Sequence, residues 1–217
     1  MNDKELVAQH AARLVKNGMT VGLGTGSTAD FFIAELARRQ QAEGLDVTCV
    51  SSSVVSMLKA QKLGLPLVAI EHLTNLDLYV DGADEVDPNR KLIKGGGGAL
   101  TREKIIAAAS KKFVCIVDST KNVDVLGAFP LPVEVIPMSR NYVANELEKL
   151  GGRPVWRKDY YTDNGCEILD VHGLKITDPV KLESIINGIT GVVTNGLFAE
   201  RDADVVLVGN GDKVDTM

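Results

Sequence analysis

Short apolar runs of strand length alternate with helical patterns through the first half of the chain, and this alternation most constrains its fold. The apolar runs are Thr20–Leu23, Val47–Val50, Leu67–Ile70, Leu76–Val80 and Phe113–Val117. Helical patterns start at Asn2, follow the glycine loop at Gly22–Asp30, and follow the serines at Ser51–Ser53. Strands that alternate with helices imply right-handed crossovers and a parallel sheet covered on both faces.

The pattern changes near Pro130, where the sequence PLPVEVIP begins a region ordered strand, helix, strand, strand, helix, strand. The predicted elements are Val133–Ile136, Arg140–Leu150, Pro154–Arg157, Glu167–Val171, Pro179–Ile189 and Val192–Phe198. This order matches a split βαβ, ferredoxin-like unit. Asp163-Asn164-Gly165 predicts a turn between the two middle strands. The last apolar run, Ala203–Val208, is predicted to return to the first sheet.

Composition and charge narrow the classes of function. The 217 residues are 45% hydrophobic and 24% charged, which is ordinary for a soluble globular protein. The net charge of −5 argues against nucleic-acid and membrane partners. The N-terminus has no signal-peptide pattern, and no apolar run approaches the ~18 residues of a membrane span. Scattered cysteines indicate reduced thiols in a cytoplasmic protein, and the three histidines lack metal-ligand spacing, so we expect no zinc site.

The segment Tyr79–Lys104 concentrates the chemistry of the chain. It holds several carboxylates, a lysine at Lys94, four consecutive glycines and Glu103. A glycine run loses much backbone entropy on folding, so it is best explained where backbone amides approach a ligand. Acid, base and bare backbone together predict an active site that moves protons on a small anionic substrate.

The loop Gly22–Asp30, GLGTGSTAD, follows a strand and opens a helix, where backbone N–H groups and the helix dipole can hold a phosphate. It has no lysine for a Walker A motif, and Ser27 replaces the third glycine of a dinucleotide fingerprint. The hydroxyls of Thr25, Ser27 and Thr28 suit a monophosphate or a sugar better. The alternative is a tight turn capped by Ser27 or Thr28.

The motif DGADEVD begins at Asp81, directly after a predicted strand, and therefore lies at the carboxyl edge of the sheet, where ligands of open α/β folds bind. Asp81 and Asp84 could accept hydrogen bonds from sugar hydroxyls and shuttle their protons. A solvated acidic turn and a magnesium site are the alternatives.

Glu103 lies in a predicted helix, Leu100–Ala109. Its neighbours three and four positions away are all apolar: Ala99, Leu100, Ile106 and Ala107. A carboxylate beside apolar surface has a raised proton affinity, as a general base requires. The alternative is a first-turn acid that the helix dipole favours.

Seven blocks in order resemble the type A family of ribose-5-phosphate isomerases. These blocks are GLGTGSTA, SSS, YVDGADEVD, KGGGGALTREKI, FPLPVEVIP, LGGRP and GVVTNGLFA. The resemblance implies a Rossmann-like α/β domain, residues 1–128 and 204–217, with an inserted ferredoxin-like α+β domain, residues 129–203. It also implies no cofactor, a homodimer or a tetramer, and interconversion of ribose 5-phosphate with ribulose 5-phosphate.

The resemblance further implies roles for individual residues. Glu103 would be the proton acceptor, with Asp81, Asp84 and Lys94 as further catalytic groups. The substrate-binding residues would be Lys4, Thr25, Gly26, Ser27, Thr28, Asp81, Gly82, Ala83, Asp84, Lys94, Gly95, Gly96, Gly97 and Lys121. A sugar-phosphate sensor without turnover, and an acyl- or coenzyme-A-transferring enzyme with Glu103 as nucleophile, are the rival functions.

Overall fold

The structure is a computed structural model that describes residues 2–72 and 75–217. Contacts within the chain divide it into two units. The first unit comprises residues 1–82, 102–121 and 203–217, and the second comprises residues 83–101 and 122–202. The predicted domain boundaries after residues 128 and 203 stay a prediction. The two units differ from those domains because residues 83–101 and 122–128 make their contacts within the second unit.

The first unit is built on a six-stranded sheet. Its strands are β1 (Met19–Leu23), β2 (Val47–Ser51), β3 (Leu76–Asp81), β6 (Ser110–Asp118), β12 (Val205–Asn210) and β13 (Lys213–Thr216). They lie in the order β13-β12-β6-β3-β1-β2, and every pair is parallel except β12 with β13. The predicted parallel sheet and the predicted return of the last apolar run to it are both confirmed.

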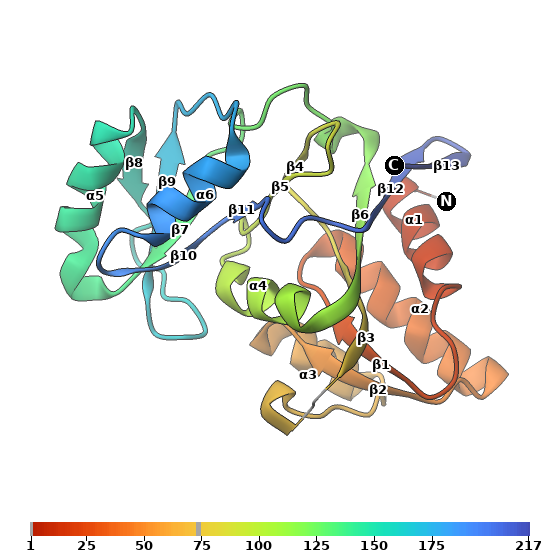
Figure 1. The fold of residues 1–217 in the computed structure, drawn as a ribbon. Coiled ribbons are helices and arrows are strands. Elements are labelled where there is room, and N and C mark those ends of the chain that lie inside the picture. Colours follow the sequence, from red (N-terminus) through yellow and green to blue (C-terminus); the bar gives the residue numbers. More distant parts are fainter. Residues whose placement is uncertain (1, 73–74) are drawn as a thin grey trace. The chain divides into compact units, whose positions relative to one another are not determined.

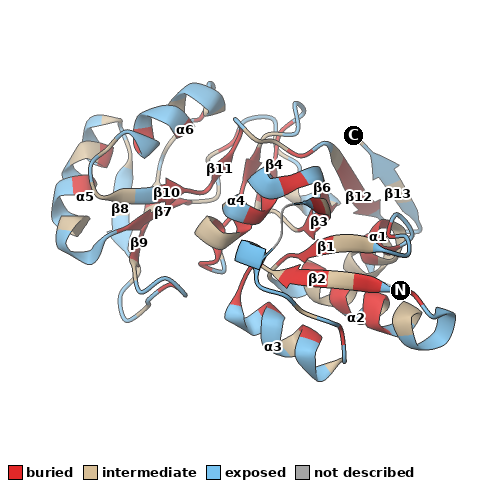
Figure 2. Ribbon diagram, turned by 60° about the horizontal axis from the view of Figure 1, so that its bottom comes forward, coloured by how far each residue is buried: buried red, intermediate tan, exposed pale blue. Residues whose placement is uncertain are grey.

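Two helices pack side by side against one face of this sheet, α1 (Asp3–Ala12) and α2 (Ser27–Glu43) (Figure 1). Phe32, Ile33 and Leu36 of α2 are fully buried against Val21 and Leu23 of β1. Figure 2 shows the buried residues of α2 turned toward the strands. The apolar face predicted for α2 therefore forms the main core of the first unit.

The other face of the sheet receives α4 (Leu100–Ala109), of which the residues from Arg102 onward belong to the first unit. A side chain at Gly22 would place its Cβ 2.7 Å from Ile106 Cγ2 and 2.8 Å from Tyr79 Cδ2. The absence of a side chain at Gly22 thus lets α4 approach β1 closely. Tyr79 stacks on Phe113 beside it, with ring centroids 5.0 Å apart.

The second unit contains an antiparallel sheet of four strands, β7 (Leu131–Val135), β8 (Arg153–Trp156), β9 (Glu167–His172) and β10 (Val192–Asn195). Their order is β10-β7-β9-β8, which is the strand order of a split βαβ unit. Helices α5 (Arg140–Lys149) and α6 (Pro179–Asn187) supply core residues such as Val143 and Ile186 to this sheet (Figure 1). The predicted ferredoxin-like order is confirmed.

Two predicted strands differ from the structure: one is absent and the other is divided. Leu67–Ile70 forms no strand: Leu67 makes one isolated bridge to Cys49, and Ile70–His72 is a 3-10 turn. This run lies outside the edge strand β2. Leu67 packs against the core and is half-buried, but Val68 and Ala69 are exposed, and among the described strands the run bonds to β2 alone. Val192–Phe198 is broken at Gly196 into β10 and β11 (Leu197–Phe198), because β11 pairs with β5 (Leu92–Ile93) instead of β7. β5 also pairs with β4 (Glu85–Val86).

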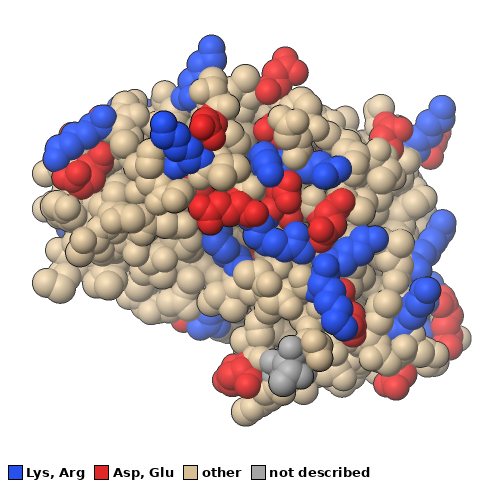
Figure 3. Space-filling model, in the orientation of Figure 1, with Lys and Arg blue, Asp and Glu red and all other residues tan. Residues whose placement is uncertain are grey.

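The remaining helix, α3 (Val54–Lys62), follows β2 and begins at the side-chain cap of Ser53, which accepts a hydrogen bond from the Ser56 N–H. Cys49 is fully buried in β2, and this burial raises the pKa of its thiol to about 12. Across the described residues, no helix combines the length and apolar character needed to span a bilayer. Basic and acidic side chains are interspersed over the face drawn in Figure 3.

Replacing Phe32 with alanine tests the core of the first unit. The ring is fully buried among apolar neighbours, so Phe32→Ala should lower the free energy of unfolding by about 3–5 kcal/mol. Urea unfolding followed by circular dichroism measures the change. Val55→Ala, at a side chain that is 70% exposed, is the control and should stay within about 0.5 kcal/mol of the parent. Equal effects of the two variants would contradict the assigned core.

Candidate active site

The loops of the first unit that carry the predicted site residues lie at one edge of its sheet. Neighbouring parallel strands pair Ser51 with Leu23, Leu23 with Val80, and Asp81 with Cys115. Because parallel strands end at the same edge, the segments after β1, β2, β3 and β6 meet there. The structure thus brings together the glycine loop, the serines, Asp81 and the segment that ends at Lys121.

Asp81 ties these loops together. Its Oδ1 accepts the Thr25 N–H at 3.0 Å and the Gly82 N–H at 2.8 Å, and its Oδ2 accepts the Tyr79 hydroxyl. The carboxylate is fully buried, so these donors replace water. A Cβ at Gly24 would lie 2.1 Å from Asp81 Oδ1, so the loop can reach this carboxylate only with glycine there.

A cluster of hydroxyl groups surrounds Thr25. Its Oγ1 lies 2.8 Å from the Oγ atoms of both Ser52 and Ser53, and Ser56 Oγ donates to the Gly24 carbonyl at 2.8 Å. The Thr25 hydroxyl, predicted to bind substrate, is therefore held by serines of the next loop. Sequence reasoning used the serine triplet as a helix start and as one block of the family resemblance, and missed this cluster.

The N-terminus of α2 begins directly after this cluster. Gly26 has φ +103° and is the N-cap residue, and no side chain caps the helix. The capping by Ser27 or Thr28, considered as the alternative for this loop, is therefore wrong. Instead, Lys4 Nζ donates to Ser27 Oγ at 2.9 Å, and Thr28 Cβ lies 3.8 Å from the position of a Cβ at Gly82. A cation, a hydroxyl and open helix N–H groups are the usual components of an anion site.

Glu103 is buried in the first turn of α4, with 4% of its surface exposed. The helix has the predicted bounds, and the four apolar neighbours predicted for Glu103 are buried as well. Burial raises the pKa of the Tyr79 phenol well above its usual value, and the charges of Asp81 and Glu103 raise it further. Tyr79 thus lies near both carboxylates, and sequence reasoning did not identify it as part of the site.

Lys121 ends the 3-10 turn Ser119–Lys121 that follows β6. The turn is held by Asp118, whose Oδ1 accepts the Thr120 N–H at 3.0 Å. The Lys121 side chain is half-buried at the same sheet edge as the glycine loop.

The second unit holds the other predicted residues. Asp84 Oδ2 accepts the Gly96 N–H at 2.8 Å, which joins the acidic motif to the glycine run. The Lys94 side chain is buried, with its Nζ 5.4 Å from the centre of the Phe198 ring. The backbone N–H of Lys94 donates to the Gly196 carbonyl at 2.8 Å. Ala83 precedes Asp84 in the same half-exposed loop.

Two carboxylates of the acidic motif bind backbone of their own unit. Glu85 accepts the N–H groups of Gly127 and Phe129, at 2.7 Å and 2.5 Å. Asp87 Oδ1 accepts the N–H groups of Asn89 and Lys91, both at 2.8 Å. These contacts shape loops, which leaves Asp81 and Asp84 as the candidates for chemistry in this motif. Among the described residues, no group of three or more potential metal ligands comes together.

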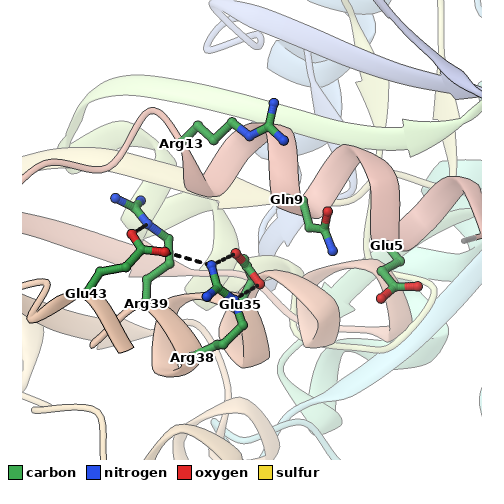
Figure 4. A pocket seen from close by; sticks show the side chains of 7 residues that line it. All are labelled: Glu5, Gln9, Arg13, Glu35, Arg38, Arg39 and Glu43. Carbon is green, nitrogen blue, oxygen red and sulfur yellow. Dashed lines mark hydrogen bonds and ion pairs between the residues drawn. The ribbon is translucent and has the colours of Figure 1, made fainter. Parts of the chain in front are cut away.

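A polar cleft of about 620 Å³ between α1 and α2 is a separate feature (Figure 4). Its lining residues are Glu5, Gln9, Arg13, Glu35, Arg38, Arg39 and Glu43. Arg38 pairs with both Glu35 and Glu43, at 2.7 Å and 2.8 Å, and these pairs raise the pKa of its guanidinium. Glu35, Arg38, Arg39 and Glu43 pair with one another within α2. None of the predicted site residues lines the cleft, so it is not the candidate active site.

Comparison with known proteins gives one family. Residues 48–213 match the family model described as Ribose 5-phosphate isomerase A (phosphoriboisomerase A). A solved ribose 5-phosphate isomerase A from Neisseria gonorrhoeae is 42% identical, with a TM-score of 0.95 over 99% of this chain and 95% of that one. The enzyme from Methanocaldococcus jannaschii is 43% identical, with a TM-score of 0.95 over 99% and 97% of the two chains.

A third solved structure is a D-ribose-5-phosphate isomerase in complex with phospho-erythronic acid. It is 38% identical, with a TM-score of 0.96 over 100% of this chain and 99% of that one. These similarities span both units. The family resemblance and the α/β fold class derived from the sequence blocks are thereby confirmed.

Replacing Tyr79 with phenylalanine tests the link to Asp81. Tyr79→Phe should lower the free energy of unfolding by about 1–3 kcal/mol at neutral pH, because Asp81 loses a donor while buried. In the unfolded chain the phenol ionises near pH ~10, whereas in the folded protein its pKa is higher. Unfolding of the parent therefore releases a proton above about pH 10, and its stability falls as pH rises.

The difference between parent and variant should consequently narrow above about pH 10. Urea unfolding at several pH values measures it. Tyr161→Phe, at a side chain that is 64% exposed, is the control and should show neither effect. A difference that stays constant up to high pH would contradict the raised pKa of Tyr79.

Proposed function

The chain belongs to the ribose 5-phosphate isomerase A family, and we propose that it interconverts D-ribose 5-phosphate and D-ribulose 5-phosphate through an enediolate. This reaction moves one proton between adjacent carbons, and it needs a base, a donor for the developing oxyanion and an anchor for the phosphate. The observation that carries the proposal is Glu103, which is buried in the first turn of α4 among apolar neighbours.

We assign the general base to Glu103. It would take the proton from carbon 2 of the aldose and return it to carbon 1. Its burial removes competing water, and a desolvated carboxylate is a stronger base than an exposed one. Glu103 shares the neighbourhood of Tyr79 with Asp81, so a proton acceptor and a buried hydrogen-bonded carboxylate lie near the same phenol.

Lys94 and the glycine run Gly95, Gly96 and Gly97 are proposed to surround the oxyanion. The Gly96 N–H already donates to Asp84 Oδ2, so the stabilising donors are Lys94 and the other amides of the run. Lys94 is buried, and in a site of low dielectric an ammonium group stabilises a developing negative charge strongly. Gly97 is exposed within the glycine run, so its backbone is accessible to a ligand.

Asp84, with Asp81, is proposed to accept the sugar hydroxyls and to assist opening of the furanose ring. Asp84 is half-exposed and uses Oδ2 for the Gly96 N–H. Asp81 is buried and holds Thr25, Gly82 and Tyr79. Asp84 is therefore the carboxylate better suited to contact the sugar, with Ala83 beside it.

The phosphate is proposed to bind at the N-terminus of α2, with Gly26, Ser27 and Thr28 as backbone and hydroxyl donors. Lys4, already 2.9 Å from Ser27 Oγ, and Lys121 would supply positive charge. Binding energy from this remote group can be used to align the reacting carbons.

Family membership favours this enzyme over the rival sensor and acyl-transfer functions. We also propose that the chain acts in the non-oxidative pentose phosphate pathway, in the cytoplasm, as a homodimer, with a tetramer as the alternative. Three free cysteines support a reducing compartment. Exposed apolar side chains such as Met138 and Tyr142 support subunit contact, which sedimentation would test.

A coupled assay tests the reaction directly. The purified protein should convert ribose 5-phosphate to ribulose 5-phosphate without added cofactor. Phospho-erythronic acid, the ligand of the third solved relative, should inhibit competitively. A protein that binds ribose 5-phosphate without turnover would be a sensor, and the proposal would be wrong.

Glu103→Gln should lower kcat by about 10²–10⁴-fold, because it removes the base and keeps nearly the same volume. The melting temperature should hold, and enzyme-dependent uptake of solvent deuterium at carbon 1 or carbon 2 should disappear. Glu5→Gln changes a first-turn glutamate of α1 and is the matched control, with kcat expected to be unchanged. A near-parental rate in Glu103→Gln would move the base to Asp81 or Asp84.

Lys4→Met should raise KM for ribose 5-phosphate about tenfold or more while kcat changes less, because loss of uniform binding appears in KM. Turnover of free ribose should be unaffected, since it carries no phosphate. Lys62→Met, at an exposed lysine of α3, is the control. Equal losses with both sugars would show that Lys4 does not serve the phosphate.

A further inference from the structure

The glycine run in the second unit is a tight turn with one exposed peptide group. Gly95 and Gly98 have φ values of +100° and +82°, and the Gly98 N–H donates to the Gly95 carbonyl at 2.9 Å. The Gly96 N–H is taken by Asp84. The Gly97 N–H, in contrast, donates to no acceptor within the described part of the chain, and Gly97 is exposed.

Arg157, which follows β8, holds this turn through a carbonyl. Its Nη1 donates to the Gly96 oxygen at 3.2 Å. Its other nitrogens form a two-pronged ion pair with Asp170 of β9, with Nε–Oδ2 at 2.9 Å and Nη2–Oδ1 at 2.6 Å. Because both side chains are about four-fifths buried, the pair fixes the guanidinium firmly to the sheet.

Tyr160 holds the next carbonyl of the turn. Its hydroxyl donates to the Gly97 oxygen at 3.1 Å, and its ring centre lies 5.3 Å from the Arg157 guanidinium carbon. A Cβ at Gly98 would lie 1.9 Å from the Tyr160 oxygen, so the phenol packs where only glycine permits it. The carbonyls of two successive residues of the turn, Gly96 and Gly97, thus accept hydrogen bonds from two side chains of one short loop.

The hydrogen bond to the Gly96 carbonyl also fixes the orientation of the Gly97 N–H. The Gly96 carbonyl and the Gly97 N–H belong to one planar trans peptide, so they point in opposite directions. A carbonyl fixed by Arg157 therefore fixes the direction of the Gly97 N–H. The positively charged guanidinium, hydrogen-bonded to the Gly96 oxygen, also polarises this peptide group, which makes the Gly97 N–H a stronger donor.

We propose that Arg157 and Tyr160 are positioning residues that orient the Gly97 N–H as a hydrogen-bond donor to the oxyanion of the enediolate. The inference rests on the proposed isomerase function and adds to it a source of preorganisation outside the glycine motif. A donor held in place before the reaction stabilises developing charge without reorganisation. Its loss should therefore affect the chemical step more than substrate binding.

The test measures kcat and KM for ribose 5-phosphate in Arg157→Met, Arg157→Lys and Tyr160→Phe. Removing one oxyanion donor outright costs ~10²–10³-fold in kcat, so a misdirected donor in Arg157→Met should cost about tenfold or more, with KM changed less than about threefold. Lysine keeps a charge and one donor but cannot form the two-pronged pair, so Arg157→Lys should recover part of the rate. Tyr160→Phe should show a smaller fall in kcat.

Arg140→Met is the matched control. Arg140 also pairs with a carboxylate of β9, Glu167, at 2.9 Å and stacks 3.9 Å from the Trp156 ring centre in the same unit. This variant should lose thermal stability as Arg157→Met does, yet keep kcat. Similar kcat values in the two arginine variants, or a rise in KM alone, would overturn the inference.

Should Arg157→Met not fold, Tyr160→Phe decides alone, and a parental kcat in the folded variant would overturn the inference. The proposed function fails separately, because in that case the parent protein itself would show no isomerisation. Failure of the inference leaves the parent active and the variants equally active.

Discussion

The buried carboxylate of Asp81 is the contact on which the first unit's site depends. It ends β3 and accepts hydrogen bonds from the loop after β1, from the residue that follows it and from a phenol on its own strand. A charge in this position is tolerated only because donors replace its hydration. The same donors belong to the segments that must be held in place for a ligand. The hydrogen bonds that solvate the Asp81 charge therefore also position these loops.

Three glycines permit close contacts within the two units. Gly22 makes room for a helix against a strand, Gly24 makes room for a carboxylate, and Gly98 makes room for a phenol. In each case the neighbour that fills the space carries or supports a proposed functional group. The sequence shows the glycines, but their neighbours come from elements distant along the chain.

Much of the fold and part of the site could be predicted from the sequence. Periodicity predicted the parallel sheet, the split βαβ unit and the burial around Glu103, because the spacing of apolar residues determines which side of an element faces the core. Leu67–Ile70 misled because composition does not reveal whether a run has a partner on both sides, and among the described strands this run bonds to β2 alone. The hydroxyl cluster at Thr25 escaped because Ser52 and Ser53 approach it only through the pairing of β1 with β2. Arg157 is 61 residues from its carbonyl partner, and no local pattern relates them.

The burial of Cys49 has a consequence for the handling of this protein. Its thiol, with a pKa raised to about 12, stays protonated at neutral pH, and a protonated thiol is a poor nucleophile. Alkylating reagents should therefore reach this sulfur only after β2 leaves the sheet. Cys49 is a built-in reporter of the opening of the edge strand β2, and the rate of its modification would follow that opening equilibrium without any engineered probe.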